Sequence, residues 1–306
     1  DLWNALEFTS TGFKLTHGSS NAVNGSGSDY VYMAIRRPDG LVGKPPTVGT
    51  DVFAMDVAGS SSPAFDSGFP VDFALVRNPS SSANWDVGAR LIQGKNLRTN
   101  TTAAETTYSS NAFDYQSSWL DNTSYSNNQS WMWKRHAGFD VVTYKGNSGG
   151  DTSGDSQVIS HNLGKVPEMI WVKAREGGSG FWGVGHKDLN SGTNPWHYRL
   201  LLNDTYAESA GTAGTHTTWY WNDTAPTTTN FSVGEISNTN ENNTNFIAML
   251  FASVDGISKV GSYIGNASTS GPTITTGFSP RFIIIKCASV AGTNWFVYDT
   301  LRGLTA

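Results

Sequence analysis

The sequence predicts an all-β protein built from tandem, related β-sandwich modules of the jelly-roll or lectin-like kind, each about 100 residues long and with negligible helix. The first observation is that only 15% of the residues are charged, against roughly 25% in an average soluble domain. The charged side chains that usually cover the solvent-exposed face of a helix are therefore scarce. The second is an aromatic content of 12%, which suits pleated, half-buried strands. The third is a set of internal repeats.

The first repeated element is a strand followed by a loop. A proline introduces a short apolar run, and a tryptophan follows the proline after the same interval of 15 residues in all three copies. The pairs are Pro70 with Trp85, Pro167 with Trp182, and Pro280 with Trp295. Apolar runs of this length, bounded by Gly and Ser loops, are typical of strands buried on both faces. The recurrence of the tryptophans indicates packing rather than ligand contact.

A second element carries the repeat further along the chain. The segment Tyr30–Gly40 aligns without a gap with Phe246–Gly256, and a more divergent middle copy ends at Gly138. A third block follows each glycine, at Phe139–Asn147 and Ser258–Asn266, with a weaker counterpart at Asp51–Gly59. Gly40, Gly138 and Gly256 thus mark one repeat position, and their spacing suits a small β-domain better than a solenoid turn.

These alignments divide the chain into four parts. Residues 1–50 form a partial first repeat with strands of the second-half type, and 51–138 form one sandwich repeat. Residues 139–256 form another, and 257–306 begin a further one. No window shows helical periodicity. Because the sequence starts at Asp1 without a Met or a signal-peptide pattern, we expect a processed product or a piece of a longer protein.

Composition also limits the partners. A net charge of −5 argues against binding nucleic acid through bulk charge. No run approaches the 18 apolar residues of a membrane span, and the lone Cys287 excludes a disulfide scaffold and a multi-cysteine metal site. We therefore expect no nucleic acid, no membrane and no cofactor. The Ser-, Thr- and Asn-rich composition is typical of proteins that work outside a cytoplasm.

Catalytic and metal motifs are weak, and we predict neither a catalytic residue nor a metal ligand. Gly146–Gly150 matches the G-x-S-x-G pattern, but the following residues cannot begin the helix that a nucleophile elbow requires, so a turn is favoured. The six His residues show no metal-ligand spacing. Asp151–Asp155 lacks the alternating acids of a calcium loop. No acidic pair sits in an apolar run that would raise a pKa.

Aromatic residues outside the repeat positions are the remaining candidates for recognition. Trp119, Trp196 with Tyr198, and Trp219 have no counterpart in the other copies. An exposed aromatic ring can stack on the apolar face of a sugar, so these four residues are candidate carbohydrate platforms. Packing in a core or an interface is the competing interpretation, and we weigh it ahead of sugar binding at each position.

The repeat blocks also carry a resemblance. The segments Phe139–Asn147, Ile159–Lys173, Tyr220–Thr224 and Phe246–Gly256 resemble a module of virion proteins from marine and freshwater tailed phages, usually described only as a domain of unknown function. The resemblance covers residues 139–306, while 1–138 match as diverged copies. It implies a structural or appendage role and supplies no catalytic residues.

These observations together predict a non-enzymatic structural protein of a bacteriophage particle, such as a tail fibre, a tail-associated part or a capsid decoration. Its location would be the virion or the extracellular space. Its partners would be copies of itself in a homo-oligomer, other virion proteins and host-surface glycans, bound through multivalent contacts. The alternative is a carbohydrate-binding or adhesive extracellular module or filament subunit. A polysaccharide depolymerase ranks last, because no acidic pair stands out.

Overall fold

The computed structural model describes residues 6–8, 13–15, 48–120, 127–150, 153–177, 180–210, 219–267 and 272–302. It confirms the all-β class with very little helix, while the finer assignment to jelly-roll modules stays a prediction. Gly40 and most of the partial first repeat lie outside the described residues. No described helix has the length and apolar character needed to cross a membrane.

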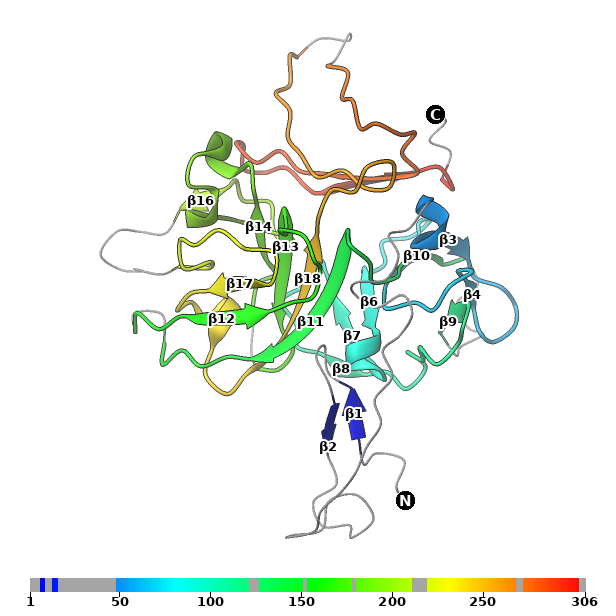
Figure 1. Cartoon of the computed structure of the whole chain (residues 1–306). Helices are drawn as coiled ribbons and strands as arrows, with labels where there is room; N and C mark the ends of the chain where they lie inside the picture. The colour runs from blue at the N-terminus through cyan, green and yellow to red at the C-terminus, as the bar shows by residue number, and fades with distance from the viewer. Residues whose placement is uncertain are drawn as a thin grey trace, which may run out of the picture.

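Two six-stranded antiparallel sheets form the body of the protein (Figure 1). The first has the order β3-β10-β5-β6-β7-β8 and the second the order β11-β18-β13-β14-β15-β16. The first consists of β3 (Phe53–Val57), β5 (Phe73–Arg77), β6 (Asp86–Ala89), β7 (Lys95–Arg98), β8 (Thr106–Thr107) and β10 (Gln129–Trp133). The second consists of β11 (Phe139–Lys145), β13 (Met169–Ala174), β14 (Gly183–His186), β15 (Tyr198–Leu201), β16 (Ser209–Ala210) and β18 (Asn245–Phe251).

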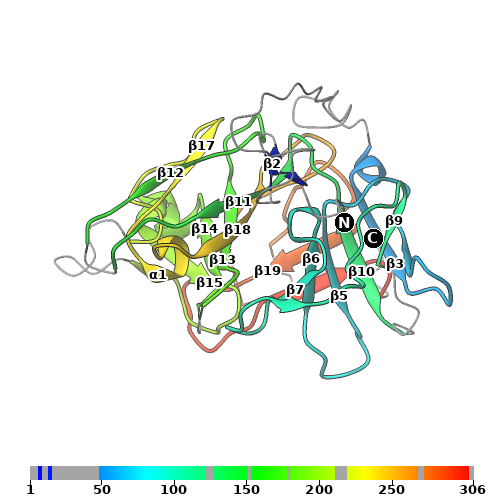
Figure 2. The same cartoon turned by 90° about the horizontal axis from the view of Figure 1, so that it is seen from below.

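Smaller elements complete the fold. Each large sheet is accompanied by a two-stranded sheet, and two further strand pairs lie near the ends of the chain (Figures 1 and 2). These pairs are β4 (Phe65–Asp66) with β9 (Ser118–Trp119), β12 (Gln157–Ser160) with β17 (Asn230–Val233), β1 (Leu6–Phe8) with β2 (Phe13–Leu15), and β19 (Phe282–Ile285) with β20 (Phe296–Asp299). The helical turns are η2 (Gly49–Asp51), η3 (Arg90–Ile92), η4 (Leu189–Gly192), η5 (Pro195–His197) and α1 (Ser237–Asn240).

The two large sheets follow the same plan. Among the described residues, the first unit (β3 to β10) and the second unit (β11 to β18) each contain eight strands. In both, the first strand pairs with the last, the last pairs with the third, and the second and seventh form the small sheet. We call residues 252–302 the third segment, because its β19 and β20 pair as the third and fourth strands of each unit do.

Side chains alternate between the two faces of the third strand in each unit, so this strand contributes residues to two separate cores. In β5, Ala74 and Val76 join a local core with β4 and β9. Phe73 and Leu75 point to the opposite face and join a core that both units share. Successive side chains of a strand point to opposite faces, so one strand contributes to both layers. The second unit repeats the arrangement, with a local core under β12 and β17.

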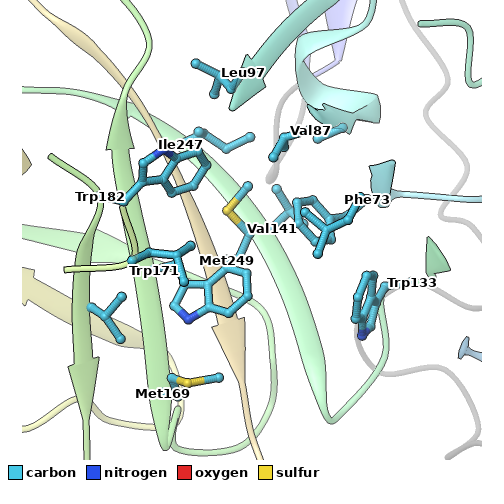
Figure 3. Packing of buried hydrophobic residues seen from close by; sticks show 14 of the residues in the cluster. Phe73, Val87, Leu97, Trp133, Val141, Met169, Trp171, Trp182, Ile247 and Met249 are labelled. Atoms are coloured by element: carbon cyan, nitrogen blue, oxygen red, sulfur yellow. The ribbon is translucent and has the colours of Figure 1, made fainter. Parts of the chain in front are cut away.

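The shared core is where the units meet (Figure 3). Trp133 and Leu97 of the first unit belong to the same buried cluster as Trp171 and Met249 of the second. The third segment packs against this cluster as well, through Phe282, Ile284, Trp295 and Val297. The indole N–H of Trp131 also donates to the carboxylate of Asp299 across 3.1 Å. All three parts therefore bury their inner faces in one apolar interior.

The same hydrogen bond joins each unit to the next. The Trp182 indole Nε1 donates to the Arg98 carbonyl of the first unit at 2.8 Å. The Trp295 Nε1 donates to the Leu201 carbonyl of the second unit at 2.8 Å. Arg98 and Leu201 are each the last residue of the fifth strand in their unit. Two of the recurring tryptophans thus bind equivalent backbone positions in the preceding unit.

A lysine accompanies each indole, buried at Lys173 and half-buried at Lys286. Lys173 Nζ donates to the carbonyls of Thr102 at 3.1 Å and Gly180 at 2.7 Å. Lys286 Nζ donates to the carbonyls of Thr205 at 3.4 Å and Thr293 at 2.7 Å. A backbone bond follows in both places, from Glu105 N to Arg175 O and from Glu208 N to Ala288 O, each 2.7 Å long. We call these contacts the unit junction.

The remaining recurring residues lie at strand starts and turns. Pro70, Pro167 and Pro280 precede β5, β13 and β19, while Trp85, Trp182 and Trp295 come directly before β6, β14 and β20. Gly138 and Gly256 differ in their backbone roles. A Cβ on Gly138 would lie 2.6 Å from the His136 ring, whereas Gly256 needs a positive φ of 73°.

The junction indole provides a matched stability test. Trp182 and Trp171 are both buried in the shared core, but the Trp171 Nε1 has no hydrogen-bond partner among the described residues. We expect Trp182→Phe to lower the free energy of unfolding by about 0.5–1.5 kcal/mol more than Trp171→Phe, because only the former removes an indole hydrogen bond. Urea unfolding followed by circular dichroism measures both. Equal losses would contradict the role of the bond.

The junction lysine provides a pH test. Burial lowers the pKa of Lys173 from its ordinary 10.5 to about 8. Between these values the unfolded chain binds more protons than the native protein, so the Lys173 contribution to stability increases as pH rises. We expect wild-type stability to rise relative to Lys173→Met between pH 8 and 10.5, by at most about 1.4 kcal/mol per pH unit. Denaturant unfolding across this pH range measures the difference, and a constant or falling difference would contradict it.

Candidate functional site

An open pocket on the second unit is the best candidate for a ligand site. Its volume is about 690 Å³ and its lining is mainly polar. The walls come from the turn before β15 and from the loop that leads to β17. The lining residues are Gly192, Asn194, Pro195, Trp196, His197, Asp223 and Ala225.

Both walls are longer than their counterparts in the first unit. The loop between β14 and β15 spans residues 187–197, whereas the loop between β6 and β7 spans only 90–94. The connection between β16 and β17 spans 211–229, and its counterpart spans 108–117. The pocket is therefore an addition to the shared plan of the units. Extra loop length on a rigid scaffold is where proteins commonly place binding residues.

The pocket loops have an unusual backbone. Asn190, Ser191 and Asn194 have φ values of 50°, 55° and 46°, and Asn222 and Asp223 have 53° and 46°. Side chains with a Cβ rarely adopt this left-handed conformation, and Asn and Asp tolerate it best. Each such residue costs of order 1 kcal/mol, so the rest of the fold must hold these loops in place.

A histidine and a carboxylate lie side by side in the pocket. His197 Nδ1 is 2.7 Å from Asp223 Oδ1. When the neutral imidazole carries its proton on Nδ1 and donates a hydrogen bond to the carboxylate, Nε2 remains free to act as an acceptor. The second Asp223 oxygen is a further acceptor, and the Asp223 side chain is 45% exposed. The pair can accept hydrogen bonds from the hydroxyl groups of a ligand.

The structure corrects two of the proposed aromatic platforms. Trp119 is 1% exposed and lies between the rings of Phe65 and Phe113 in the local core of the first unit. Trp196 is 7% exposed, and its ring packs edge-on against Trp221 at 6.0 Å. Neither presents a free face to a sugar, because the unrepeated tryptophans fill space particular to one unit. Trp196 forms part of the pocket wall instead.

The other two platform candidates are half-buried and do not line the pocket. Tyr198 follows Trp196 and His197 and packs against the shared core. Trp219 packs against the local core of the second unit, with its ring 5.3 Å from that of Tyr220. Stacking of a sugar on either ring stays a prediction. Sequence reasoning missed His197 and Asp223, because they lie 26 residues apart in two loops with no shared motif.

The G-x-S-x-G segment forms a hydrogen-bonded turn. Ser148 is buried, and its hydroxyl donates to the carbonyl of Glu235 at 2.8 Å. A Cβ on Gly146 would lie 2.2 Å from the Glu241 carbonyl oxygen, so a larger residue cannot occupy that position. Across the described part of the chain, His, Cys, Asp and Glu side chains form no group of three suited to a metal ion.

The comparisons with known proteins give one match. The model of a family described as a domain of unknown function, DUF7483, matches residues 57–305. No curated protein and no solved structure matches the chain.

The floor of the pocket can be tested with a glycine substitution. A Cβ on Gly185 would lie 2.6 Å from the Trp196 ring and 2.8 Å from the Trp221 ring. We expect Gly185→Ala to lower the free energy of unfolding by about 1–3 kcal/mol, because both rings must move. Gly261→Ala is the control, since a Cβ there meets nothing within 4 Å. Thermal unfolding compares the variants, and an equal effect of the two would refute the packing described.

Proposed function

Because the chain belongs to the DUF7483 family, whose description names no activity, we propose its function from its sequence and architecture: a non-enzymatic structural part of a bacteriophage particle. The part is a tail fibre, a tail-associated protein or a capsid decoration, located in the virion. It works through assembly with copies of itself and other virion proteins. The module resemblance described for residues 139–306 supports the phage origin.

The unit junction is the observation that carries the structural role. The same indole, lysine and backbone contacts join the first unit to the second and the second to the third segment. A chain whose parts are linked by one repeated set of bonds has the rigidity that a particle component needs. Such repetition also presents outward loops at regular positions, which favours multivalent attachment.

Particle composition tests this proposal. Mass spectrometry of purified phage particles, with antibody labelling under the electron microscope, is expected to find the chain at a regular position and in multiple copies. Its absence from particles, together with a monomeric state in solution, would contradict the proposal. Shortening of a host polysaccharide by the purified chain would contradict the non-enzymatic role.

Glycan binding at the pocket is a second candidate function, favoured by the two loops particular to the second unit. The pocket combines the Trp196 wall with the exposed acceptors of His197 and Asp223. This matches the general composition of ligand sites, where a few placed polar groups fix the orientation of the ligand. In this version the chain is an adhesive or carbohydrate-binding module on the particle or on a secreted filament.

A glycan array tests the pocket directly. We expect Asp223→Asn to reduce binding of a recognised glycan about tenfold or more, because a hydrogen bond to a charged group contributes about 1.5–3 kcal/mol. Asp114→Asn, which changes an exposed carboxylate of the first unit, is the control and keeps wild-type binding. An array without any signal, or equal losses in both variants, would exclude this candidate.

A further inference from the structure

The paired side chains of the pocket present hydrogen-bond acceptors to a ligand. One oxygen of the exposed Asp223 carboxylate lies 2.7 Å from His197 Nδ1. An ionised carboxylate accepts hydrogen bonds and donates none, and Nε2 of the ring is a further acceptor when Nδ1 carries the proton. The ligand groups that meet this pair must therefore carry N–H or O–H donors.

Both members of the pair stand on short turns that hold them in place. On one side, His197 N donates to Asn194 O at 3.0 Å. On the other, Thr224 N donates to Trp221 O at 3.1 Å, which closes a turn with Asp223 inside it. Acceptors fixed in this way bind a ligand with little loss of side-chain or loop entropy. The positions of the acceptors can therefore select among ligands.

The two loops that form the pocket carry a negative balance of charge. By sequence, they contain no arginine and a single lysine, Lys187, against two acidic residues, Asp188 and Asp223. The Lys187 Nζ lies 2.7 Å from a carboxylate oxygen of Glu168, so its charge is already compensated. The loops thus offer a ligand the Asp223 carboxylate and no uncompensated Lys or Arg.

An acidic ligand is disfavoured in two independent ways. An ionised carboxylate or sulfate carries acceptors alone, so it cannot supply the donors that Asp223 and the His197 Nε2 require. It also brings a second negative charge next to Asp223, and like charges a few ångströms apart repel each other. The Glu208 carboxylate, which accepts from Asn190 N at 2.6 Å, adds to the same potential. Hydroxyl, amide and ammonium groups avoid both penalties.

We propose that the pocket binds sugar residues that are neutral or carry an amine, and that it rejects acidic ones. The selectivity rests on glycan binding at this pocket, the second candidate function above, and adds the class of sugar that is recognised. Hydroxyl or ammonium groups of the sugar donate to Asp223 and His197. An acidic sugar meets an unmatched acceptor and a like charge, and such repulsive elements are a common source of specificity.

A variant that adds a charge tests the selectivity without altering the pair. Ala225 lines the pocket with an exposed side chain, so Ala225→Lys places an ammonium group there. The matched control is Ala291→Lys, which adds the same charge at an exposed alanine of the third segment. Each native full-length chain is titrated on array pairs of glycans that differ only in the presence of a sialic acid, a sulfate or a uronic acid carboxylate.

We expect the wild type to bind the acid-free member of each recognised pair at least about tenfold more tightly, the ratio that a repulsion of about 1.4 kcal/mol produces. In Ala225→Lys the ratio is expected to fall to about threefold or less, because the added cation offsets the charge of Asp223. Ala291→Lys is expected to keep the wild-type ratio.

The outcomes separate this selectivity from glycan binding itself. Equal or tighter binding of the acidic members by the wild type would overturn the selectivity and leave glycan binding at the pocket standing. An array without any signal would exclude both. A ratio that falls equally in Ala225→Lys and Ala291→Lys would assign the discrimination to the net charge of the chain, which is −5, and would overturn its origin in the pocket.

A second variant removes the charge of the pair and keeps the turn. Asp223 has a φ of 46°, a conformation that Asn also tolerates. We expect Asp223→Asn to weaken binding of the acid-free members about tenfold or more, while binding of the acidic members does not fall. Equal weakening of both members would overturn the proposal, because charge would then play no part in the selection.

Discussion

The inner face of each large sheet has no cover within its own unit, and the rest of the architecture follows from this constraint. The small sheets β4–β9 and β12–β17 protect only the outer faces. On the inner side, Trp131 and Trp133 of β10 and Ile247 and Met249 of β18 meet in one cluster, to which β19 and β20 add their apolar residues. Large aromatic side chains bury much apolar area at such meeting points.

A shared interior requires the polar backbone at its border to be paired. The strands β7 and β15 each end in a carbonyl that faces the neighbouring unit, and an indole N–H donates to it in both places. Lys173 and Lys286 bind the next carbonyls along the same connections. An unpaired buried carbonyl is costly. This accounts for the recurrence of tryptophan and lysine at positions 182, 295, 173 and 286.

The pocket lies on a part of the fold that this constraint leaves free to vary. The pocket is formed by the loop between β14 and β15 and by the loop that leads to β17, and the counterparts of both loops in the first unit are shorter. Asn194 and Asp223 adopt left-handed backbone there without disturbing the strands that carry the junction. Scaffold and candidate site are thus separable, since the scaffold depends on repeated residues and the pocket on residues of the second unit alone.

The sequence predicted the parts of the fold that rest on local patterns. Low charge and abundant aromatics indicated an all-β chain, and the Pro-to-Trp interval identified residues that lie at the start of paired strands. The direction of the Trp182 indole was beyond prediction, because its acceptor is a backbone carbonyl, which leaves no mark on residue type. The pocket pair was missed for a related reason, since His197 and Asp223 meet only through the folding of two loops. Trp119 and Trp196 were candidate platforms because they do not recur, with packing the favoured interpretation, and their burial shows that non-recurring residues also fill space particular to one unit.

The central claim is that the two units and the third segment share one core and fold as one body. Differential scanning calorimetry of the full chain tests it most directly. The account predicts a single transition whose calorimetric and van't Hoff enthalpies agree, as for one cooperative unit. Two or more separated transitions, each with the enthalpy of a domain of about 100 residues, would show that the units fold independently and would contradict the account.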